Sequence, residues 1–435
     1  MSRFQHASVD RRILALAVPA LGSLAVEPIY VITDTAIIGR LGTQQLAGLA
    51  IAASVLSIVF AGANFLTYGT TQQVAKRLGA GDRAGAANVG MQAMWLAVVF
   101  GIPAALLLGI GARTVVGVFG ATGAIADHAV DYLSISAIGV PFILVTLAAQ
   151  GVLRGAANYT TPLWILLAAN VANLVLELVF VFVFDWGVPG SAWSTVISQA
   201  AAAAAFVQLM RRQLAGAAVR RPSWTGMSPL VTAGRHLLLR VGSMLVVLSG
   251  STLLAARIDD STLAAHQIVL TMFAFLALVL DALAVPAQTI VAEELGRGDA
   301  ATAALVSRRS VVLSVGTGIA LAALLAMLAP VLPRVFTGDA AVIDRATSGL
   351  WWLAAIMLPG AIAFAYDGIL IGAGDYRFLG RAAFGYTIVV VPFAVLILLF
   401  PSVGIGGIWG AMLIWMLLRA GVNHRHAGTV LALRR

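Results

Sequence analysis

The sequence predicts an all-α integral membrane protein with twelve transmembrane helices in two six-helix lobes. Three observations carry this prediction: an apolar composition, twelve long apolar segments, and an internal repeat. Of the 435 residues, 60% are hydrophobic and only 10% are charged, which is far more apolar than soluble domains are. The composition therefore excludes a soluble globular protein.

The apolar segments divide into two series of six, and each segment is near or above the roughly 20 residues that span a bilayer. The longest polar interruption, residues 211–229, separates the two series. We therefore predict an N-terminal lobe at 1–211, a cytoplasmic inter-lobe loop at 212–229 and a C-terminal lobe at 230–435. The predicted spans are 12–40, 46–76, 87–111, 124–152, 160–184, 188–211, 235–256, 262–293, 303–333, 344–373, 380–400 and 403–423.

The two halves of the chain repeat at a constant offset. Residues 74–82 (VAKRLGAGD) match residues 291–299 (VAEELGRGD), and residues 153–158 match residues 370–375, both at an offset of 217. A six-span unit returns the chain to the side where it began, so the repeats should be parallel and related by an axis along the membrane normal. Glycine followed by aspartate in the LGxGD segments is explained by a helix C-cap and the start of the next helix.

The basic residues indicate topology rather than nucleic-acid binding. All but one of the 27 are arginine, and we assign most of them, including Arg419, to the side of the termini. By the positive-inside rule both termini should be cytoplasmic in a plasma (inner) membrane. The opposite side receives only Arg40, Arg113, Arg257, Arg334 and Arg345, and Arg240 lies inside a span.

Five carboxylates lie well inside the predicted spans. A charged side chain there costs roughly 2.5 to 3.5 kcal/mol on insertion scales, so such groups are candidates for function. A carboxylate neutralised in a structural hydrogen-bond network is the alternative. The five are Glu27, Asp34, Glu177, Asp281 and Asp367.

The first span places two of these acids on one helical face. Glu27 and Asp34 are seven residues apart, which is about two helical turns. Pro28 lies between them, and a proline inside a helix frees a backbone carbonyl and favours a bend. This pattern predicts a polar cavity beside a hinged helix.

The fifth and sixth spans carry polar side chains at helical spacing. Asn173 and Glu177 are at i, i+4, with Asn170 one turn earlier, and Thr195 and Gln199 repeat this spacing on the next span. If these helices pack against the first span, their side chains form one polar pocket with Asp34. Interhelical hydrogen bonding without a transport role is the alternative, and for Thr195 and Gln199 both interpretations stay open.

The repeat adds an argument for function. At the offset of 217, Asp34 corresponds to Ser251 and Glu177 to Ala394, so the second lobe lacks this pocket. A structural requirement common to both lobes would have been kept in both. Asp281 and Asp367 are polar residues of the second lobe that do not belong to this pattern. For each of them, a functional role and a structural role remain equal alternatives.

Enzymatic activity is not expected. The chain has no cysteine and no HExxH, GxSxG or Walker motif, so it lacks the usual nucleophile, metal and phosphate sites. We expect no cofactor and no resident metal, with a Na⁺ site in the N-terminal pocket as the alternative.

Taken together, several motifs resemble those of the MATE (multidrug and toxic compound extrusion) family, and specifically its DinF-type branch. They are EPxxxxxDTAIIGRLG from residue 27, VAKRLGAGD, LRGAANYTTPL from residue 153, NLVLE from residue 173, GxAxxTxxxQ from residue 190, AAHQI from residue 264 and DGILIGAGDYR from residue 367. The resemblance covers nearly the whole chain and implies two six-helix lobes in a V shape.

The resemblance also implies an activity and its residues. The protein would be a secondary active antiporter that exports organic, cationic and amphipathic compounds by alternating access, coupled to proton entry. Asp34 would be the coupling carboxylate with Glu27 and Glu177 as its partners. Because the family often has glutamine at the first of these partner positions and aspartate at the second, Na⁺ remains the alternative coupling ion.

The expected partners are small organic substrates and the lipid bilayer, with the protein as a monomer. Two rival functions stay in view. A lipid-linked precursor flippase of the same superfamily would need an arginine-lined cavity, whereas the predicted pocket is acidic. A major-facilitator carrier would also have two parallel six-span repeats, but it leaves the carboxylates and proline of the first span unexplained.

Overall fold

The computed structural model describes residues 3–215 and 221–433, and within them twelve helices are long and apolar enough to cross a membrane. The predicted all-helical fold with twelve spans is confirmed. The elements are α1 (Arg3–Gly39), α2 (Thr43–Ala63), α3 (Phe65–Gly79), α4 (Arg83–Val118), α5 (Gly123–Gly155), α6 (Thr160–Leu178), a π-helix η1 (Val179–Val183), α7 (Gly187–Gln213), α8 (Trp224–Ile258), α9 (Asp260–Gly296), α10 (Ala300–Leu328), α11 (Ala340–Gly372), α12 (Tyr376–Leu399) and α13 (Gly404–Leu433), with short 3₁₀ turns η2 (Leu332–Val335) and η3 (Pro401–Val403).

Two of the spans are interrupted, which the apolar pattern did not predict. The second span consists of α2 and α3, which are separated at Asn64. The fifth span changes from α6 into the π-helix η1 two residues after Glu177. Single π-turns inside α-helices are rare and occur frequently at functional sites.

The repeated LGxGD segments form tight helix connections, as predicted. Gly81 and Gly298 have φ angles of 75° and 78°, a left-handed conformation that glycine adopts without steric cost. The next aspartate then caps the following helix: Asp82 accepts the Gly85 N–H at 2.7 Å, and Asp299 accepts the Thr302 N–H at 2.9 Å.

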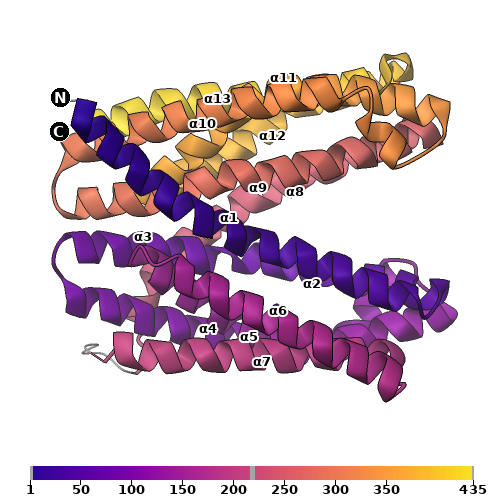
Figure 1. Cartoon of the computed structure of the whole chain (residues 1–435), viewed down its shortest axis with the longest axis horizontal. Helices are drawn as coiled ribbons and strands as arrows, with labels where there is room; N and C mark the ends of the chain where they lie inside the picture. The colour runs from indigo at the N-terminus through magenta and orange to yellow at the C-terminus, as the bar shows by residue number, and fades with distance from the viewer. Residues whose placement is uncertain (1–2, 216–220, 434–435) are drawn as a thin grey trace. The chain divides into compact units, whose positions relative to one another are not determined.

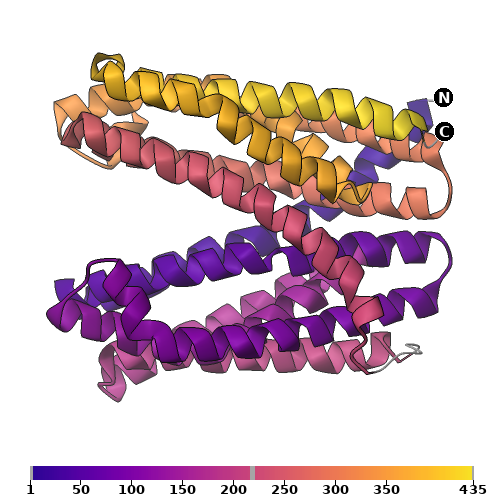
Figure 2. The same ribbon diagram turned by 180° about the vertical axis from the view of Figure 1, so that it is seen from behind.

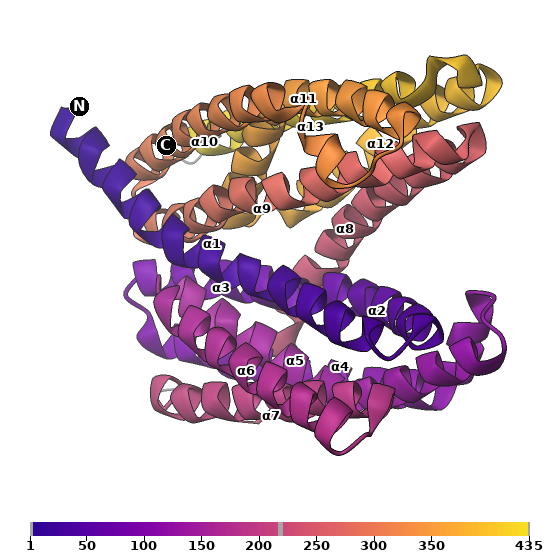
Figure 3. The same cartoon turned by 45° about the vertical axis from the view of Figure 1, so that its right-hand side comes forward.

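The chain divides into two compact units, and both boundaries fall inside helices. The first unit consists of residues 1–21 with residues 235–435, and the second of residues 22–234. These limits differ from the lobes predicted at 1–211 and 230–435, because α1 and α8 each contribute to both units. Figure 3 shows α1 as one long helix, and both ends of the chain lie at the same end of the first unit (Figure 1).

Ion pairs and apolar contacts explain why the beginning of α1 belongs to the first unit. Arg309 of α10 donates to Asp10 through two nitrogens, one of them Nε at 2.8 Å. Arg12 pairs with Glu293 and Glu294 at the end of α9. Ile13 and Ala17 of the same helix complete an apolar cluster with α9, α10 and α11.

Helices α9, α11 and α13 form the core of the first unit, and Figures 1 and 2 show them from opposite sides. Glycines allow α9 and α11 to approach closely. A Cβ atom at Gly368 would lie 2.2 Å from the carbonyl oxygen of Ala284, and one at Gly372 would lie 2.5 Å from that of Gln288. Small residues at such contacts are typical of membrane helix packing.

The predicted inter-lobe loop at 212–229 is shorter than expected, and its residues 216–220 lie outside the described structure, as do Arg434 and Arg435. Helix α7 extends to Gln213 and α8 already begins at Trp224. Gln92 of α4 holds the described part of the loop: its Nε2 donates to the carbonyl oxygen of Arg221 at 2.9 Å, and its Oε1 accepts the Ser223 N–H at 2.8 Å.

Candidate functional site

Asp34 is the centre of a buried polar site within the second unit. Its side chain accepts two hydrogen bonds, from the hydroxyl of Tyr132 to Oδ2 at 3.2 Å and from the hydroxyl of Ser191 to Oδ1. Asp34 is 5% exposed and Tyr132 3%. Three helices therefore meet at this carboxylate, namely α1, α5 and α7.

A second set of hydrogen bonds lies one helical turn from Asp34 and joins α1 to α6 and α7. The hydroxyl groups of Tyr30 and Thr195 are 2.7 Å apart. Asn173 donates from Nδ2 to Thr195 and to Ser194, both at 3.3 Å. Because residues four apart share a helical face, Tyr30 reaches α7 on the same side of α1 as Asp34.

Glu177 lies beside Asp34 and Ser191 and is fully buried. Neither of its carboxylate oxygens makes a hydrogen bond to a described residue. Buried polar groups are nearly always hydrogen-bonded, and an exception in a native protein calls for an explanation. Glu177 thus lies beside a second buried acid, an arrangement in which a proton or a small cation between the two groups reduces their mutual repulsion.

No described residue forms an ion pair with Asp34 or Glu177. The donors at Asp34 are neutral hydroxyl groups. Burying an isolated ionised carboxylate is very costly, so such groups become neutral or pair with a cation. Two adjacent acids without a basic partner therefore favour the binding of a proton or a small cation.

The structure brings together four of the predicted pocket residues: Asp34, Asn173, Glu177 and Thr195. Glu27 stays outside the cluster, because its side chain is exposed on the surface of the unit.

Gln199, Asn170 and Pro28 flank the cluster without joining its hydrogen bonds. Gln199 lies against α5, where its Oε1 packs over Gly139. Asn170 donates to the backbone carbonyl of Val26 at 3.0 Å. It thus contacts α1 two residues before Pro28, at a position where α1 remains helical.

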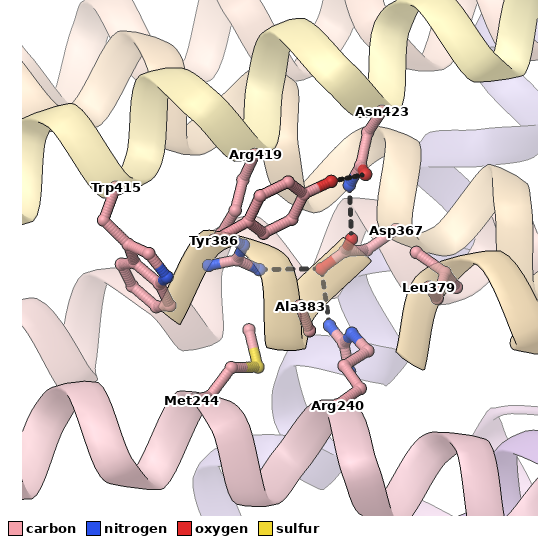
Figure 4. A pocket seen from close by; sticks show the side chains of 9 residues that line it. All are labelled: Arg240, Met244, Asp367, Leu379, Ala383, Tyr386, Trp415, Arg419 and Asn423. Carbon is pink, nitrogen blue, oxygen red and sulfur yellow. Dashed lines mark hydrogen bonds and ion pairs between the residues drawn. The ribbon is translucent and has the colours of Figure 1, made fainter. Parts of the chain in front are cut away.

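Asp367 occupies a different kind of site, in the first unit (Figure 4). Its Oδ2 accepts hydrogen bonds from Arg240 and from Arg419, the latter at 2.7 Å, and its Oδ1 accepts one from Asn423 at 2.8 Å. The Asn423 amide oxygen in turn accepts the hydroxyl of Tyr386 at 2.8 Å. This network connects α8, α11, α12 and α13.

One sequence-based assignment in the first unit needs correction. Arg419, assigned to the membrane face beside the termini, is 3% exposed and lies within α13, because the Asp367 carboxylate holds it inside the unit. His266 of the AAHQI segment is fully buried, with Nε2 3.2 Å from the Thr252 hydroxyl. Asp281 is half-buried in α9 and does not line the Asp367 pocket.

Sequence reasoning missed the hydroxyl groups that surround Asp34. Tyr30 precedes Asp34 by four residues, and Ser191 precedes Thr195 by four, so helical spacing was a signal for both. Tyr132 is on α5, for which no polar face was predicted. Among the described residues no group of three or more His, Cys, Asp or Glu side chains is arranged to hold a metal ion.

Comparison with known proteins identifies the family. The MatE family model matches residues 19–179 and 239–396. "Protein DETOXIFICATION 44, chloroplastic" of Arabidopsis thaliana is 30% identical over 97% of this chain and 82% of its own length. "DNA damage-inducible protein F" of Escherichia coli is 25% identical over 96% of this chain and 93% of its own. A "Probable multidrug resistance protein NorM" of Bradyrhizobium diazoefficiens is 28% identical over 94% and 91%.

Solved structures show the same fold. The "Crystal structure of MATE in the bent conformation" superposes with a TM-score of 0.91 at 19% identity, over 100% of this chain and 99% of the other. The "Outward-facing conformation of a multidrug resistance MATE family transporter of the MOP superfamily" gives 0.90 at 19% identity, over 98% and 96%. With its twelve spans and a family model that matches most of its length, the chain belongs to the MATE family of membrane transporters.

Proposed function

We propose that this MATE transporter exports organic, cationic and amphipathic compounds in exchange for protons, with Na⁺ as the alternative coupling ion. One observation supports the proposal above all: Asp34 and Glu177 are adjacent, buried acids that have no cationic partner among the described residues. The same negative site attracts a proton and an organic cation. We propose that the protein acts as a transporter and not as an enzyme. We do not propose that it is a lipid-linked precursor flippase or a major-facilitator carrier.

The hydrogen bonds around Asp34 are suited to reversible protonation. Tyr132 and Ser191 donate hydroxyl hydrogens to an ionised Asp34, and a hydroxyl group can rotate to accept a hydrogen bond when the acid is protonated. A proton on Asp34 therefore removes a buried charge without leaving these hydroxyl groups unpaired. Substrate is displaced because a second positive charge is no longer attracted to the neutral site.

Coupling requires two states that bind the proton and the substrate unequally. We propose that α1 supplies them by bending near Pro28. Tyr30 and Asp34 both follow this proline, and they make the contacts of α1 with α7. A bend there would move both side chains together, so the hydroxyl contacts of Tyr30 and Asp34 would be made in one state and broken in the other.

We further propose that the protein lies as a monomer in the plasma (inner) membrane, with both termini in the cytoplasm. The arginine distribution supports this orientation through the positive-inside rule. Both described chain ends lie at the same end of the first unit, which is consistent with an even number of spans.

Transport in proteoliposomes tests the proposed function. The purified protein is reconstituted, and efflux of a fluorescent organic cation is measured under an imposed pH gradient or an imposed Na⁺ gradient. We expect the pH gradient to drive efflux in the parent. Asp34→Asn should abolish this gradient-driven efflux and remain folded. The amide has the size of the acid, its oxygen can accept one of the two hydroxyl hydrogen bonds, and its nitrogen can donate to the other hydroxyl oxygen.

The matched control is Asp127→Asn, which removes a carboxylate from an exposed position of α5 in the same unit. It should transport like the parent. Efflux by Asp34→Asn at the parent rate would show that Asp34 is not the coupling group. Efflux driven only by the Na⁺ gradient would replace the proton by Na⁺ in the proposal.

A further inference from the structure

Three exposed arginines gather where the first turns of α12 lie beside α8. Arg377 and Arg381 are four residues apart on α12, so they share a helical face. The charges of both act on the half-buried imidazole of His236 on α8, and so does the charge of its neighbour Arg235. The two helices thus bring three positive charges to one place in the first unit. We call these three residues the arginine cluster.

No described acid neutralises the arginine cluster. None of its members forms an ion pair with a described residue. The acid nearest to Arg377 in the sequence, Asp375, is already engaged: it accepts a hydrogen bond from the His426 ring at 2.6 Å and caps α12 at the Phe378 N–H. Like charges that are held close together repel one another, so an anion between the arginines would stabilise their arrangement.

Close packing of α8 against α12 fixes the positions of these arginines. A Cβ atom at Gly380 would lie 2.6 Å from the carbonyl oxygen of His236, so glycine lets the two helices touch beside the cluster. Further along, the Thr387 hydroxyl donates to the carbonyl oxygen of Ser243 at 3.2 Å. Both contacts join residues that are 144 apart in the chain, as expected for two helices that run in the same direction.

Exposed apolar side chains continue each helix beyond the arginines. On α12, Phe384 and Ile388 follow the two arginines at helical spacing. On α8, Leu239 and Val246 follow Arg235 in the same way. Each helix therefore presents a row that is basic at one end and apolar along the rest of its length.

The two rows face the same side of the helix pair. At about 100° per residue, the row on α8 is displaced by about a quarter of a turn from the residues that contact α12. The row on α12 is displaced by about a quarter of a turn in the opposite sense. For helices that pack side by side in the same direction, these displacements turn both rows to one side. The basic ends and the apolar parts of the two rows therefore form one amphipathic surface.

The internal repeat indicates that the fold does not require the arginine cluster. At the offset of 217 residues, the counterparts of its three members, in chain order, are Val18, Thr160 and Trp164. The corresponding spans in the first half of the chain thus form without these charges. The positive-inside rule explains basic residues on this side of the membrane, but it does not explain why three of them face one surface of two adjacent helices.

We propose that the arginine cluster binds the phosphate group of an anionic phospholipid, whose acyl chains lie along the apolar rows of α8 and α12. Guanidinium groups match phosphate oxygens in geometry and charge. The cytoplasmic leaflet, to which we assign these arginines, is the one that carries anionic lipids and attracts basic segments near the membrane. A free phosphate ion would use only the basic ends of the rows, whereas a phospholipid uses their whole length.

The lipid site is independent of the proposed coupling. It belongs to the first unit, whereas Asp34 and Glu177 belong to the second. Lipid binding needs no ion gradient, so it can be measured in purified protein even if the proposed antiport fails. Equally, gradient-driven export of a cation would stand if no lipid bound here.

Native mass spectrometry of the delipidated full-length protein in detergent tests the site. The probes are phosphatidylglycerol and phosphatidylcholine with the same acyl chains, and glycerol 3-phosphate as a phosphate without chains. We expect phosphatidylglycerol to bind more tightly than phosphatidylcholine. Replacing both arginines of α12, in Arg377→Gln with Arg381→Gln, should weaken phosphatidylglycerol binding about 25-fold, or about fivefold for each arginine.

Arg308→Gln is the matched control, because Arg308 is also an exposed arginine of the first unit without an ion pair to a described residue, and it lies on α10. It should bind phosphatidylglycerol like the parent. If the double variant fails to fold, Arg381→Gln alone carries the test with its fivefold loss. Phe384→Ser, which shortens the apolar row without altering a charge, should also weaken binding.

Three results would overturn the proposal. Equal affinities for the two phospholipids would show that the headgroup charge is not recognised. Equal losses in Arg308→Gln and in the cluster variants would assign the attraction to the overall charge of the protein. Displacement of phosphatidylglycerol by glycerol 3-phosphate at an equal concentration would make the cluster a site for free phosphate compounds rather than for a lipid.

Discussion

Asp34 and Glu27 illustrate what residue spacing predicts and what it omits. Seven residues separate them, so they share a face of α1, yet only Asp34 is buried among hydrogen-bond donors. Spacing defines the face of one helix. It does not show which side chains of neighbouring helices lie beside each residue. Near Glu27, the Asn170 side chain of α6 donates to the backbone carbonyl of Val26 instead.

Glu177→Gln is expected to fold at least as stably as the parent. The glutamate oxygens make no hydrogen bond to a described residue, and no described cation faces them. A neutral amide of the same size costs less to bury than a carboxylate does. Thermal unfolding in detergent should therefore give an unchanged or higher midpoint, while gradient-driven efflux falls. A lower midpoint would mean that the acid stabilises the fold.

The Arg240–Asp367–Arg419 cluster marks the limit of sequence reasoning at the residue scale. The partners of Asp367 lie 127 and 52 residues away in the chain, and no local spacing encodes such pairs. A signal was present, because an arginine inside a span requires a nearby acceptor. Pairing Arg240 with an intramembrane acid would have pointed to Asp367 or Asp281, but not to Arg419.

At the element scale, the number and the positions of the spans were predictable, whereas their irregularities and full lengths were not: the span predicted at 235–256, for example, belongs to the longer helix α8 (Trp224–Ile258). Hydropathy averages over about 20 residues and so detects each span. The break at Asn64 and the π-helix Val179–Val183 depend on single residues and on contacts with neighbouring helices. The π-helix begins two residues after Glu177. The irregular backbone and the acid without a hydrogen bond to a described residue are therefore close together in the fifth span.

The contact between α9 and α11 gives a prediction about helix packing. In Gly368→Ala the new methyl group would meet the backbone carbonyl of Ala284, which cannot move away as a side chain can. The helices must separate, at a cost of about 1 to 3 kcal/mol for an overpacked site. Thermal unfolding should show a clear loss of stability.

Gly316→Ala is the matched control for this change. A Cβ at Gly316 has no atom within 4 Å, and alanine is the better helix former by about 1 kcal/mol. Its midpoint should therefore equal or exceed that of the parent. If both alanine variants behaved alike, close approach at Gly368 would not be a constraint.

The cap at Asp82 gives a pH prediction for the connection between α3 and α4. The Gly85 N–H and then the Arg77 guanidinium hold the pKa of Asp82 below its ordinary value. A lowered pKa means that the ionised form stabilises the folded state above the ordinary pKa, and that this contribution is lost as the pH falls through the folded pKa.

Asp82→Ala should accordingly unfold at a lower temperature than the parent at pH 7. The difference between the two proteins should shrink as the pH falls below about 4, near the ordinary pKa of an aspartate. Scanning calorimetry at several pH values measures it. A difference that stays constant down to acidic pH would assign the effect of Asp82 to something other than its charge.

At the scale of the whole molecule, the repeat predicts two similar halves, but it does not reveal where the compact units divide. Repeats are detected by sequence correspondence, whereas a compact unit is defined by contacts. The ion pairs of Asp10 and Arg12 attach the beginning of α1 to the second half of the chain. Comparing the sequence of one half with that of the other does not reveal these ion pairs.

The proposed topology can be tested by single-cysteine labelling, because the native chain has no cysteine. Ala301→Cys and Ala340→Cys place exposed thiols at the first turns of α10 and α11. A membrane-impermeant maleimide applied to intact cells should label Ala340→Cys only. In inverted vesicles it should label Ala301→Cys only, and the opposite pattern would reverse the orientation of every span.

The helix α1 has a consequence for dividing the protein. Splitting the gene between α7 and α8 would give two protein fragments. Residues 1–21 would then belong to the N-terminal fragment, although they form a compact unit with residues 235–435. Each fragment would expose surfaces made to be covered by the other. The two pieces should therefore be insoluble or degraded when produced singly and recover function only when synthesised together in one cell.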